Sequence, residues 1–186
     1  QKHLRGSQET AAGIKHMSLT AHEIARMIDL SCVQASSTEE EIRATAALAI
    51  KYDCICVFAL PAHTPLFVDL LKEHPSIHVG GVVGFPDGGA TTKGKVFEAH
   101  ELIEMGCNEL DMVINIAWLK AKKEALVYTD IHSVVEAAGD IPVKVILECH
   151  HLTDDEIARA CTICVEAGAS FVKTGTGWAP TGATLD

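Results

Sequence analysis

The sequence lacks the features that mark membrane and nucleic-acid-binding proteins. No apolar run approaches the ~18 residues of a membrane-spanning helix. Basic residues are few, with 15 Lys and Arg against 25 Asp and Glu, so the formal net charge is −10. An acidic surface disfavours nucleic acids and anionic membranes as partners. It still permits a small anionic substrate that local backbone N–H groups would hold.

Motifs for nucleotide binding and for zinc are missing as well. No G-x-G-x-x-G follows the first strand-like run, and no G-x-x-x-x-G-K-[ST] occurs. The seven cysteines are odd in number and lie mostly in apolar segments, which favours reduced thiols in a cytoplasmic protein. Cys161 and Cys164 form a single C-x-x-C inside an expected helix, whereas a zinc site needs two such pairs. We interpret both as packing residues.

Apolar strand-like runs alternate with helical patterns along the chain. The expected strands are 28–32, 54–60, 79–85, 109–115, 143–148 and 170–174. The expected helices are 21–27, 38–51, 65–74, 93–105, 129–138 and 154–167. Continuous apolar strands that alternate with helices predict a parallel sheet covered by helices. An open doubly wound sheet and a (β/α)8 TIM barrel both fit, and polar residues at the carboxyl ends of successive strands favour the barrel.

A lysine at the end of an apolar run is the most informative single residue. The run 167–172 reads as a short buried strand, so that Lys173 lies where a strand enters a loop. A partly desolvated lysine loses its proton more easily and can act as a nucleophilic amine. The glycines and hydroxyl residues after it leave room for a substrate, and their N–H groups could meet an anion. The stretch reads Phe171-Val172-Lys173-Thr174-Gly175-Thr176-Gly177.

Strand alternation places two further charged residues near Lys173. Side chains two apart share a face of a strand, so Asp111 and Lys144 point the same way on adjacent strands if those faces turn inward. Buried charges need partners, and a lysine–aspartate–lysine set meets that need. Such a set suits imine chemistry, in which the lysine attacks a carbonyl and the carboxylate moves protons. An ion-paired interior that only supports the fold is the alternative interpretation.

Six stretches in order make the sequence resemble the class I deoxyribose-phosphate aldolase family. They span roughly residues 20 to 186, and together they are far more specific than any one alone. The stretches are Ile28-Asp29-Leu30-Ser31, Cys54-Ile55-Cys56-Val57, Val82-Val83-Gly84-Phe85-Pro86, Glu109-Leu110-Asp111-Met112-Val113-Ile114-Asn115, Val143-Lys144-Val145-Ile146-Leu147-Glu148 and Val172-Lys173-Thr174-Gly175-Thr176-Gly177.

The resemblance implies a TIM barrel that reversibly splits 2-deoxy-D-ribose 5-phosphate into D-glyceraldehyde 3-phosphate and acetaldehyde. It implies that Lys173 forms the Schiff base, that Asp111 transfers protons, and that Lys144 is the supporting lysine near Asp111. It implies no metal or organic cofactor, a small phosphorylated sugar as substrate, and a homo-oligomer as one assembly state. The positions that would line the substrate pocket are Asp29, Cys56, Thr176 and Gly177.

The sequence departs from the family pattern in two ways. Gly175 stands where the family usually has serine, and only six strand–helix units are present, although a full barrel takes ~250 residues. We expect residues 1–19 to be a polar leader or a cloning remnant, and residues 20–186 to be an incomplete TIM-barrel aldolase domain, either a fragment or a short relative. An open six-stranded barrel would leave unpaired edges at its first and sixth strands.

Three other functions stay open at this point. The first is an imine-forming aldolase that acts on another carbonyl substrate. The second is a metal-assisted enzyme that uses the four consecutive candidate ligands at 148–151, Glu-Cys-His-His, although adjacent histidines on an extended chain point apart. The third is a truncated barrel without catalytic activity that serves as a binding or assembly module.

Overall fold

The computed structural model describes residues 19–184, so the expected leader lies outside the described residues except for Leu19. All six expected strands occur, and each is shorter than predicted. They are β1 (Asp29–Cys32), β2 (Cys56–Ala59), β3 (His78–Val83), β4 (Glu109–Val113), β5 (Val143–Ile146) and β6 (Phe171–Lys173). Every neighbouring pair is parallel, and the strands follow the chain in the order β1-β2-β3-β4-β5-β6. This order is that of a (β/α)8 barrel, of which six units are present.

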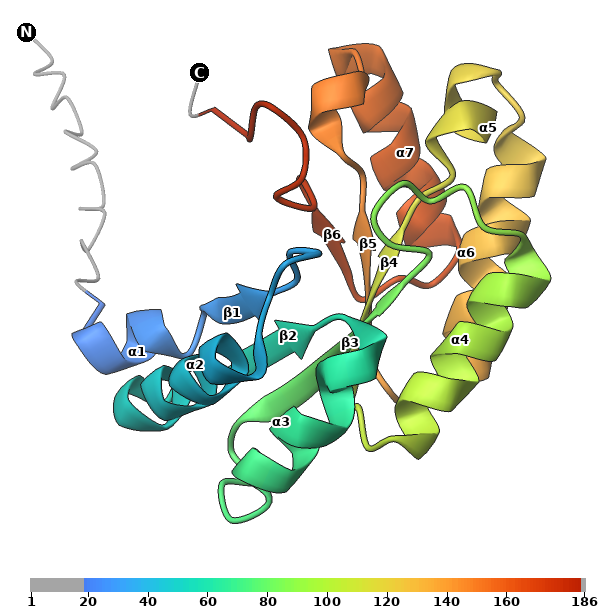
Figure 1. Ribbon diagram of the computed structural model, residues 1–186. Helices are drawn as coiled ribbons and strands as arrows, with labels where there is room; N and C mark the ends of the chain where they lie inside the picture. The colour runs from blue at the N-terminus through green and yellow to red at the C-terminus, as the bar shows by residue number, and fades with distance from the viewer. Residues whose placement is uncertain (1–18, 185–186) are drawn as a thin grey trace, which may run out of the picture.

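Helices cover the outer face of a curved sheet, whose two ends are β1 and β6 (Figure 1). The helices are α1 (Ala21–Ala25), α2 (Glu39–Tyr52), α3 (Thr64–Leu71), α4 (Thr92–Glu104), α5 (Ile116–Lys120), α6 (Glu124–Ala138) and α7 (Asp154–Glu166), with 3-10 turns η1 (Pro61–His63) and η2 (Cys149–His151). Capping boxes start α1, α2 and α7, where Thr20, Thr38 and Thr153 each pair with a glutamate three residues later. The acidic first turns of α2 and α7 complement the helix dipole.

The segment between β4 and β5 differs from the prediction. Asn115, expected to extend the fourth strand, is instead the N-cap of α5, where its side-chain oxygen accepts the N–H of Trp118 at 3.0 Å. The helix expected over 129–138 begins five residues earlier, at Glu124. The reason is that a polar turn at Lys120–Lys123 carries no apolar periodicity, so the first turn of α6 was not recognised.

The core has two layers that follow strand alternation. Leu110 and Met112 of β4 face outward into the large core between sheet and helices. The alternate residues Glu109 and Asp111 face the inner side of the sheet. A smaller apolar cluster lies on that inner side; it comprises Val33, Cys56, Phe58 and Val82. The inner side therefore mixes a few apolar residues with charged ones.

The sixth strand is exposed, which corrects the expectation of a buried strand over 167–172. Phe171 is 56% exposed and Val172 is 48% exposed. The strand begins only at Phe171 and pairs with β5 alone, because it forms one edge of the sheet. Apolar composition suggested burial, but burial requires a neighbour on both sides.

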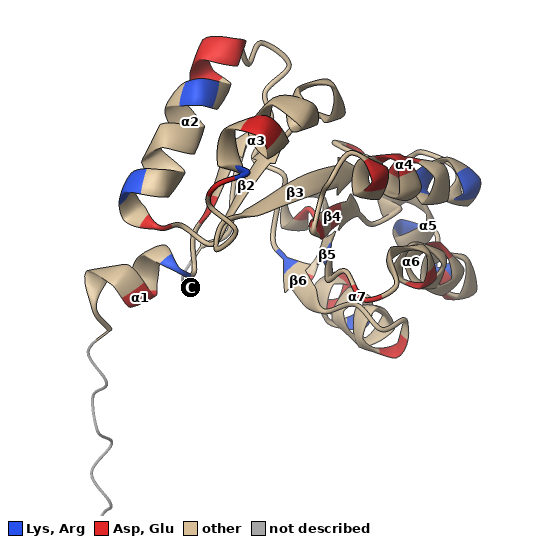
Figure 2. Cartoon of the chain, turned by 90° about the horizontal axis from the view of Figure 1, so that it is seen from below, with Lys and Arg blue, Asp and Glu red and all other residues tan. Residues whose placement is uncertain are grey.

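The outer surface carries charges of both signs, and no helix within residues 19–184 is long and apolar enough to cross a membrane. Figure 2 shows acidic and basic positions spread along the covering helices. The seven cysteines are unpaired thiols, and Cys161 and Cys164 lie in α7, as predicted.

Candidate active site

Lys173 and Asp111 form an ion pair on the inner side of the sheet. Nζ of Lys173 lies 2.6 Å from Oδ2 of Asp111, although the two residues are 62 positions apart. Asp111 is almost fully buried, whereas the side chain of Lys173 is 31% exposed at the end of β6. The strands bring them together because Asp111 pairs in register with Lys144, and Ile146, two residues further along β5, pairs with Lys173.

Lys144 lies among three carboxylates on the same inner side. Its Nζ is 3.0 Å from Oδ2 of Asp29 and 3.5 Å from Oδ1 of Asp111, and it also contacts Glu109. Alternation thus correctly predicts that Asp111, Lys144 and Lys173 meet. The ring of Phe58 makes cation–π contacts with both lysines: Nζ of Lys144 lies 4.9 Å and Nζ of Lys173 lies 5.1 Å from its centroid.

The protonation of Asp111 is perturbed by its surroundings. Burial raises the pKa of its carboxyl from the usual 3.8 to about 6, and the neighbouring Lys173 ammonium opposes part of this rise. Its Oδ2 accepts the Lys173 hydrogen bond, while Oδ1 has no hydrogen-bond partner among the described residues. A carboxyl with a pKa near neutrality can take up and release protons.

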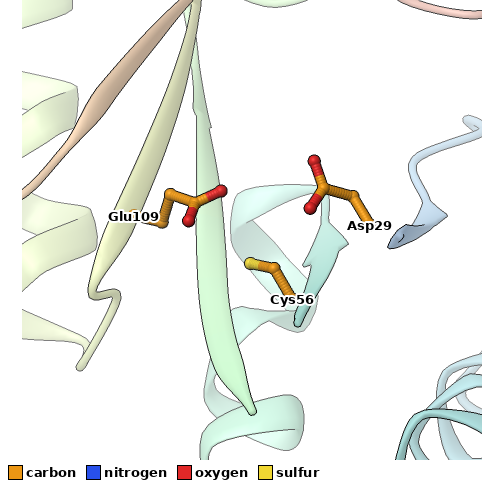
Figure 3. A group of neighbouring side chains, drawn as sticks. All are labelled: Asp29, Cys56 and Glu109. Carbon is orange, nitrogen blue, oxygen red and sulfur yellow. The ribbon is translucent and has the colours of Figure 1, made fainter. Parts of the chain in front are cut away.

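One group of side chains within residues 19–184 has ligand atoms close enough to hold a metal ion. Asp29, Cys56 and Glu109 point toward one another from β1, β2 and β4 (Figure 3). The ammonium of Lys144 contacts both carboxylates of this group. Burial also raises the pKa of the Cys56 thiol, which keeps it protonated. Because a lysine already neutralises the carboxylates and the sulfur is a thiol, these residues do not fit a metal.

Sequence reasoning missed Glu109, although alternation was enough to find it. Glu109 is two residues before Asp111 and therefore shares its inner face. Sequence reasoning also missed Phe58, because an apolar residue in a strand gives no indication that its ring will contact lysine side chains. The four candidate ligands at 148–151 do not form a metal-binding group: Glu148 turns toward Thr176, and Nδ1 of His150 lies 2.6 Å from the Thr181 hydroxyl.

The loop after Lys173 packs against the carboxyl ends of the strands. Thr176 lines a narrow cavity together with Lys173 and Asp111. Its N–H donates to Glu148 at 3.2 Å, so this N–H is already occupied and does not face an anion as expected. Gly177 has a φ of +80° and lies outside that cavity lining, where its freedom at positive φ lets the loop turn.

Trp178 holds the loop that follows β6 against the segments after β1 and β3. Its indole N–H donates to the carbonyl of Val33, after β1, at 3.0 Å, and its ring meets Phe85 edge to face at a centroid distance of 5.9 Å. The hydrogen bond joins residues that are 145 positions apart in the chain. The carboxyl ends of β1, β3 and β6 are therefore connected above the ion pairs.

Comparison with known proteins agrees with this geometry. The chain is 48% identical over 174 residues to deoxyribose-phosphate aldolase of Klebsiella pneumoniae subsp. pneumoniae. The matched region covers 92% of this chain and 70% of that protein. It is 45% identical over 168 residues to deoxyribose-phosphate aldolase of Methanothermobacter thermautotrophicus, with 90% and 74% covered.

Solved structures share the fold. A candidate deoxyribose-phosphate aldolase from Coccidioides immitis superposes with a TM-score of 0.85 at 37% identity, over 89% of this chain and 65% of that one. The deoxyribose phosphate aldolase from Aeropyrum pernix, described as tetrameric, gives 0.77 at 29% identity, over 86% and 67%. The chain thus spans less than two thirds of the first of these structures. The model of the DeoC/LacD family of aldolases matches residues 20–185, and the chain belongs to this family.

Proposed function

We propose that this chain carries the active site of a class I aldolase that cleaves 2-deoxy-D-ribose 5-phosphate to D-glyceraldehyde 3-phosphate and acetaldehyde. The observation that carries the proposal is the ion pair between Lys173 and Asp111, a buried carboxyl whose second oxygen, Oδ1, lies 3.5 Å from Nζ of Lys144. The relatives named above, which bear the name of this activity at up to 48% identity, add support.

In this proposal Lys173 is the nucleophile. Asp111 accepts a proton from the Lys173 ammonium, and the neutral amine adds to the aldehyde carbon of the open-chain sugar to form a carbinolamine. Asp111 then returns the proton to the carbinolamine hydroxyl, which leaves as water and gives a protonated Schiff base. A base removes the proton from the hydroxyl two carbons away. The bond between the carbon that bears this hydroxyl and the methylene carbon beside the iminium then breaks, and its electron pair forms the carbon–carbon double bond of an enamine. Glyceraldehyde 3-phosphate leaves, the enamine is protonated on carbon, and water releases acetaldehyde and the free lysine.

Asp111 is the proposed base and acid for these proton transfers. Its pKa of about 6 allows the carboxyl to exchange protons near neutral pH, directly or through a water molecule. Lys144 is the proposed supporting cation. Because three carboxylates surround it, its ammonium balances charge that would otherwise compete for Lys173.

The other predicted residues have proposed roles around this pair. Asp29 holds Lys144 at 3.0 Å, and Cys56 supplies a compact, neutral wall beside it. Thr176 would contact the substrate beside Lys173, where the two residues line a cavity of about 10 Å³ that a bound substrate would have to widen. Gly177 would let the loop pass close to the substrate. The resemblance to the aldolase family suggests these roles, and the positions of the four residues support them.

The test is trapping of the Schiff base. The protein is treated with sodium borohydride in the presence of 2-deoxyribose 5-phosphate, and its intact mass is compared with that of Lys173→Ala. We expect a stable adduct on the parent chain and none on the variant. Lys120→Ala, which removes a lysine on α5, is the control and should keep the adduct.

An adduct that persists in Lys173→Ala would refute the assignment of the nucleophile. No adduct on the parent chain would refute the proposal for this chain. A competing aldolase reaction would form an adduct with other carbonyl substrates but not with deoxyribose phosphate. A metal-assisted reaction would be lost with a chelator and would leave no adduct.

The cellular setting follows as part of the same proposal. A deoxyribose phosphate aldolase would serve deoxyribonucleotide catabolism in the cytoplasm, and the unpaired cysteines fit a reducing compartment. A homo-oligomer is the proposed assembly, supported by the tetramer described for the Aeropyrum pernix relative.

A further inference from the structure

Glu148 is a buried carboxylate that the proposed reaction does not use. It lies two residues after β5, directly before η2, in the left-handed region at a φ of +54°, and it is 5% exposed. One of its oxygens, Oε2, accepts both the N–H and the hydroxyl of Thr176. A non-glycine residue at positive φ carries a conformational cost. The two hydrogen bonds from Thr176 to Glu148 help to offset that cost.

The contact uses up most of the hydrogen-bonding capacity of Thr176. A hydroxyl has one hydrogen to donate and two lone pairs to accept with. The hydrogen goes to Glu148, and the N–H of Trp178 donates to the oxygen at 3.0 Å. One lone pair remains, on a side chain that lines the cavity of Lys173 and Asp111. Thr176 can therefore accept a hydrogen bond from a ligand but cannot donate one.

Gly175 leaves the space that this arrangement needs. A Cβ at position 175 would lie 2.9 Å from Oε1 of Glu148, which is closer than real Cβ contacts. The atom that it would meet is the end of a flexible side chain, so a larger residue would displace the carboxylate rather than the backbone. The Glu148–Thr176 contact thus depends on the absence of a side chain at position 175.

We infer that Glu148 is a positioning residue that fixes the Thr176 hydroxyl as a hydrogen-bond acceptor, so that the site selects an aldehyde that carries a hydroxyl. The inference rests on the proposed function. It predicts a preference for glyceraldehyde 3-phosphate over 3-phosphooxypropanal, the same aldehyde without its hydroxyl, because only the former can donate to Thr176.

The experiment measures kcat/KM for both aldehydes with acetaldehyde in the synthetic direction, and takes their ratio. One neutral hydrogen bond predicts that Thr176→Val and Glu148→Ala each lower the ratio by about 3- to 10-fold. The double variant should lower it no further, because Glu148 acts through Thr176. A purely structural role would slow both aldehydes equally and leave the ratio unchanged.

Two further variants keep the test decisive. Gly175→Ala should displace the Glu148 carboxylate and lower the ratio even if Glu148→Ala fails to fold. Glu156→Ala removes a similar threonine–glutamate contact, with Thr153 at the start of α7, and should leave the ratio unchanged. All variants are first checked for the borohydride adduct.

A ratio that stays at the parent value in folded, adduct-forming Glu148→Ala or Gly175→Ala would overturn the inference while leaving the proposed function intact. A parent chain without an adduct would refute the proposed function, and the inference with it.

Discussion

The proposed chemistry rests on a lysine at the end of β6 and an aspartate within β4, with β5 between the two strands. Lys173 is reachable from solvent, whereas Asp111 is buried beneath it. Burial favours the neutral carboxyl, and the lysine ammonium favours the ionised one. The balance leaves a pKa of about 6, which lies in the range where a carboxyl serves as both base and acid.

This balance predicts a pH dependence for cleavage. Because the ionised carboxylate of Asp111 is the proposed base, kcat/KM should rise with pH through about 6 and fall below it as Asp111 is protonated. The iminium that replaces the Lys173 ammonium keeps the positive charge, so the inflection should persist in the complex. Asp111→Asn should lower the rate by about 10²- to 10⁴-fold and remove the inflection. An unchanged acid limb in this variant would contradict the assignment of Asp111.

At the scale of elements, a second buried ion pair fastens β4 to its helices. Lys95 of α4 donates to Oδ2 of Asp130 on α6 at 2.5 Å and to the carbonyl of Val113, at the end of β4, at 2.9 Å. Thr92 also donates to Asp130 at 2.7 Å. Both members of the ion pair are fully buried. Since β4 carries Asp111, this pair holds the strand of the candidate base in place.

Breaking the pair should therefore be costly, whereas replacing it should not. Lys95→Met leaves the Asp130 carboxylate buried without its cation, and we expect a loss of about 3–5 kcal/mol in the free energy of unfolding. The double variant Lys95→Met/Asp130→Leu should recover much of this loss, because neither charge remains. Urea unfolding monitored by circular dichroism measures both. The exposed pair of Lys72 and Asp69 is the control, where Lys72→Met should cost less than about 1 kcal/mol.

At the scale of the whole molecule, the sheet has two edges in the described part of the chain, β1 and β6. An unpaired parallel edge offers free backbone N–H and C=O groups to another chain. On β6 these groups lie beside the exposed side chains of Phe171 and Val172. The chain therefore combines a well-packed outer core with an exposed, partly apolar edge.

We predict that the 186-residue chain associates with itself or with another chain, or is poorly soluble. Val172→Lys should reduce association, since charged residues protect sheet edges. Val165→Lys alters a more exposed valine, which lies on α7 and not on the edge strand, and should have no such effect. Sedimentation velocity at several concentrations distinguishes these cases. A monodisperse, stable monomer of the parent chain would contradict the prediction.

The sequence by itself determined the order of strands and helices, and with it the family of folds. Apolar periodicity and threonine–glutamate caps are local, so they are readable without tertiary contacts. Alternation in β4 and β5 also placed Asp111 and Lys144 on one face, because the period of a strand is fixed by its backbone. The helix α5 was missed because its Asn115 cap follows the strand directly and its single turn is too short to show a period.

Only the tertiary structure decided what each polar group contacts. Glu109 and Asp29 meet Lys144 across strands far apart in sequence, and Glu148 takes the N–H and hydroxyl of Thr176 instead of facing solvent. The exposure of β6 likewise depends on which strands flank it, not on its composition. Residue type and spacing fix which side chains share a face, whereas curvature of the sheet and closure of loops fix which of them touch.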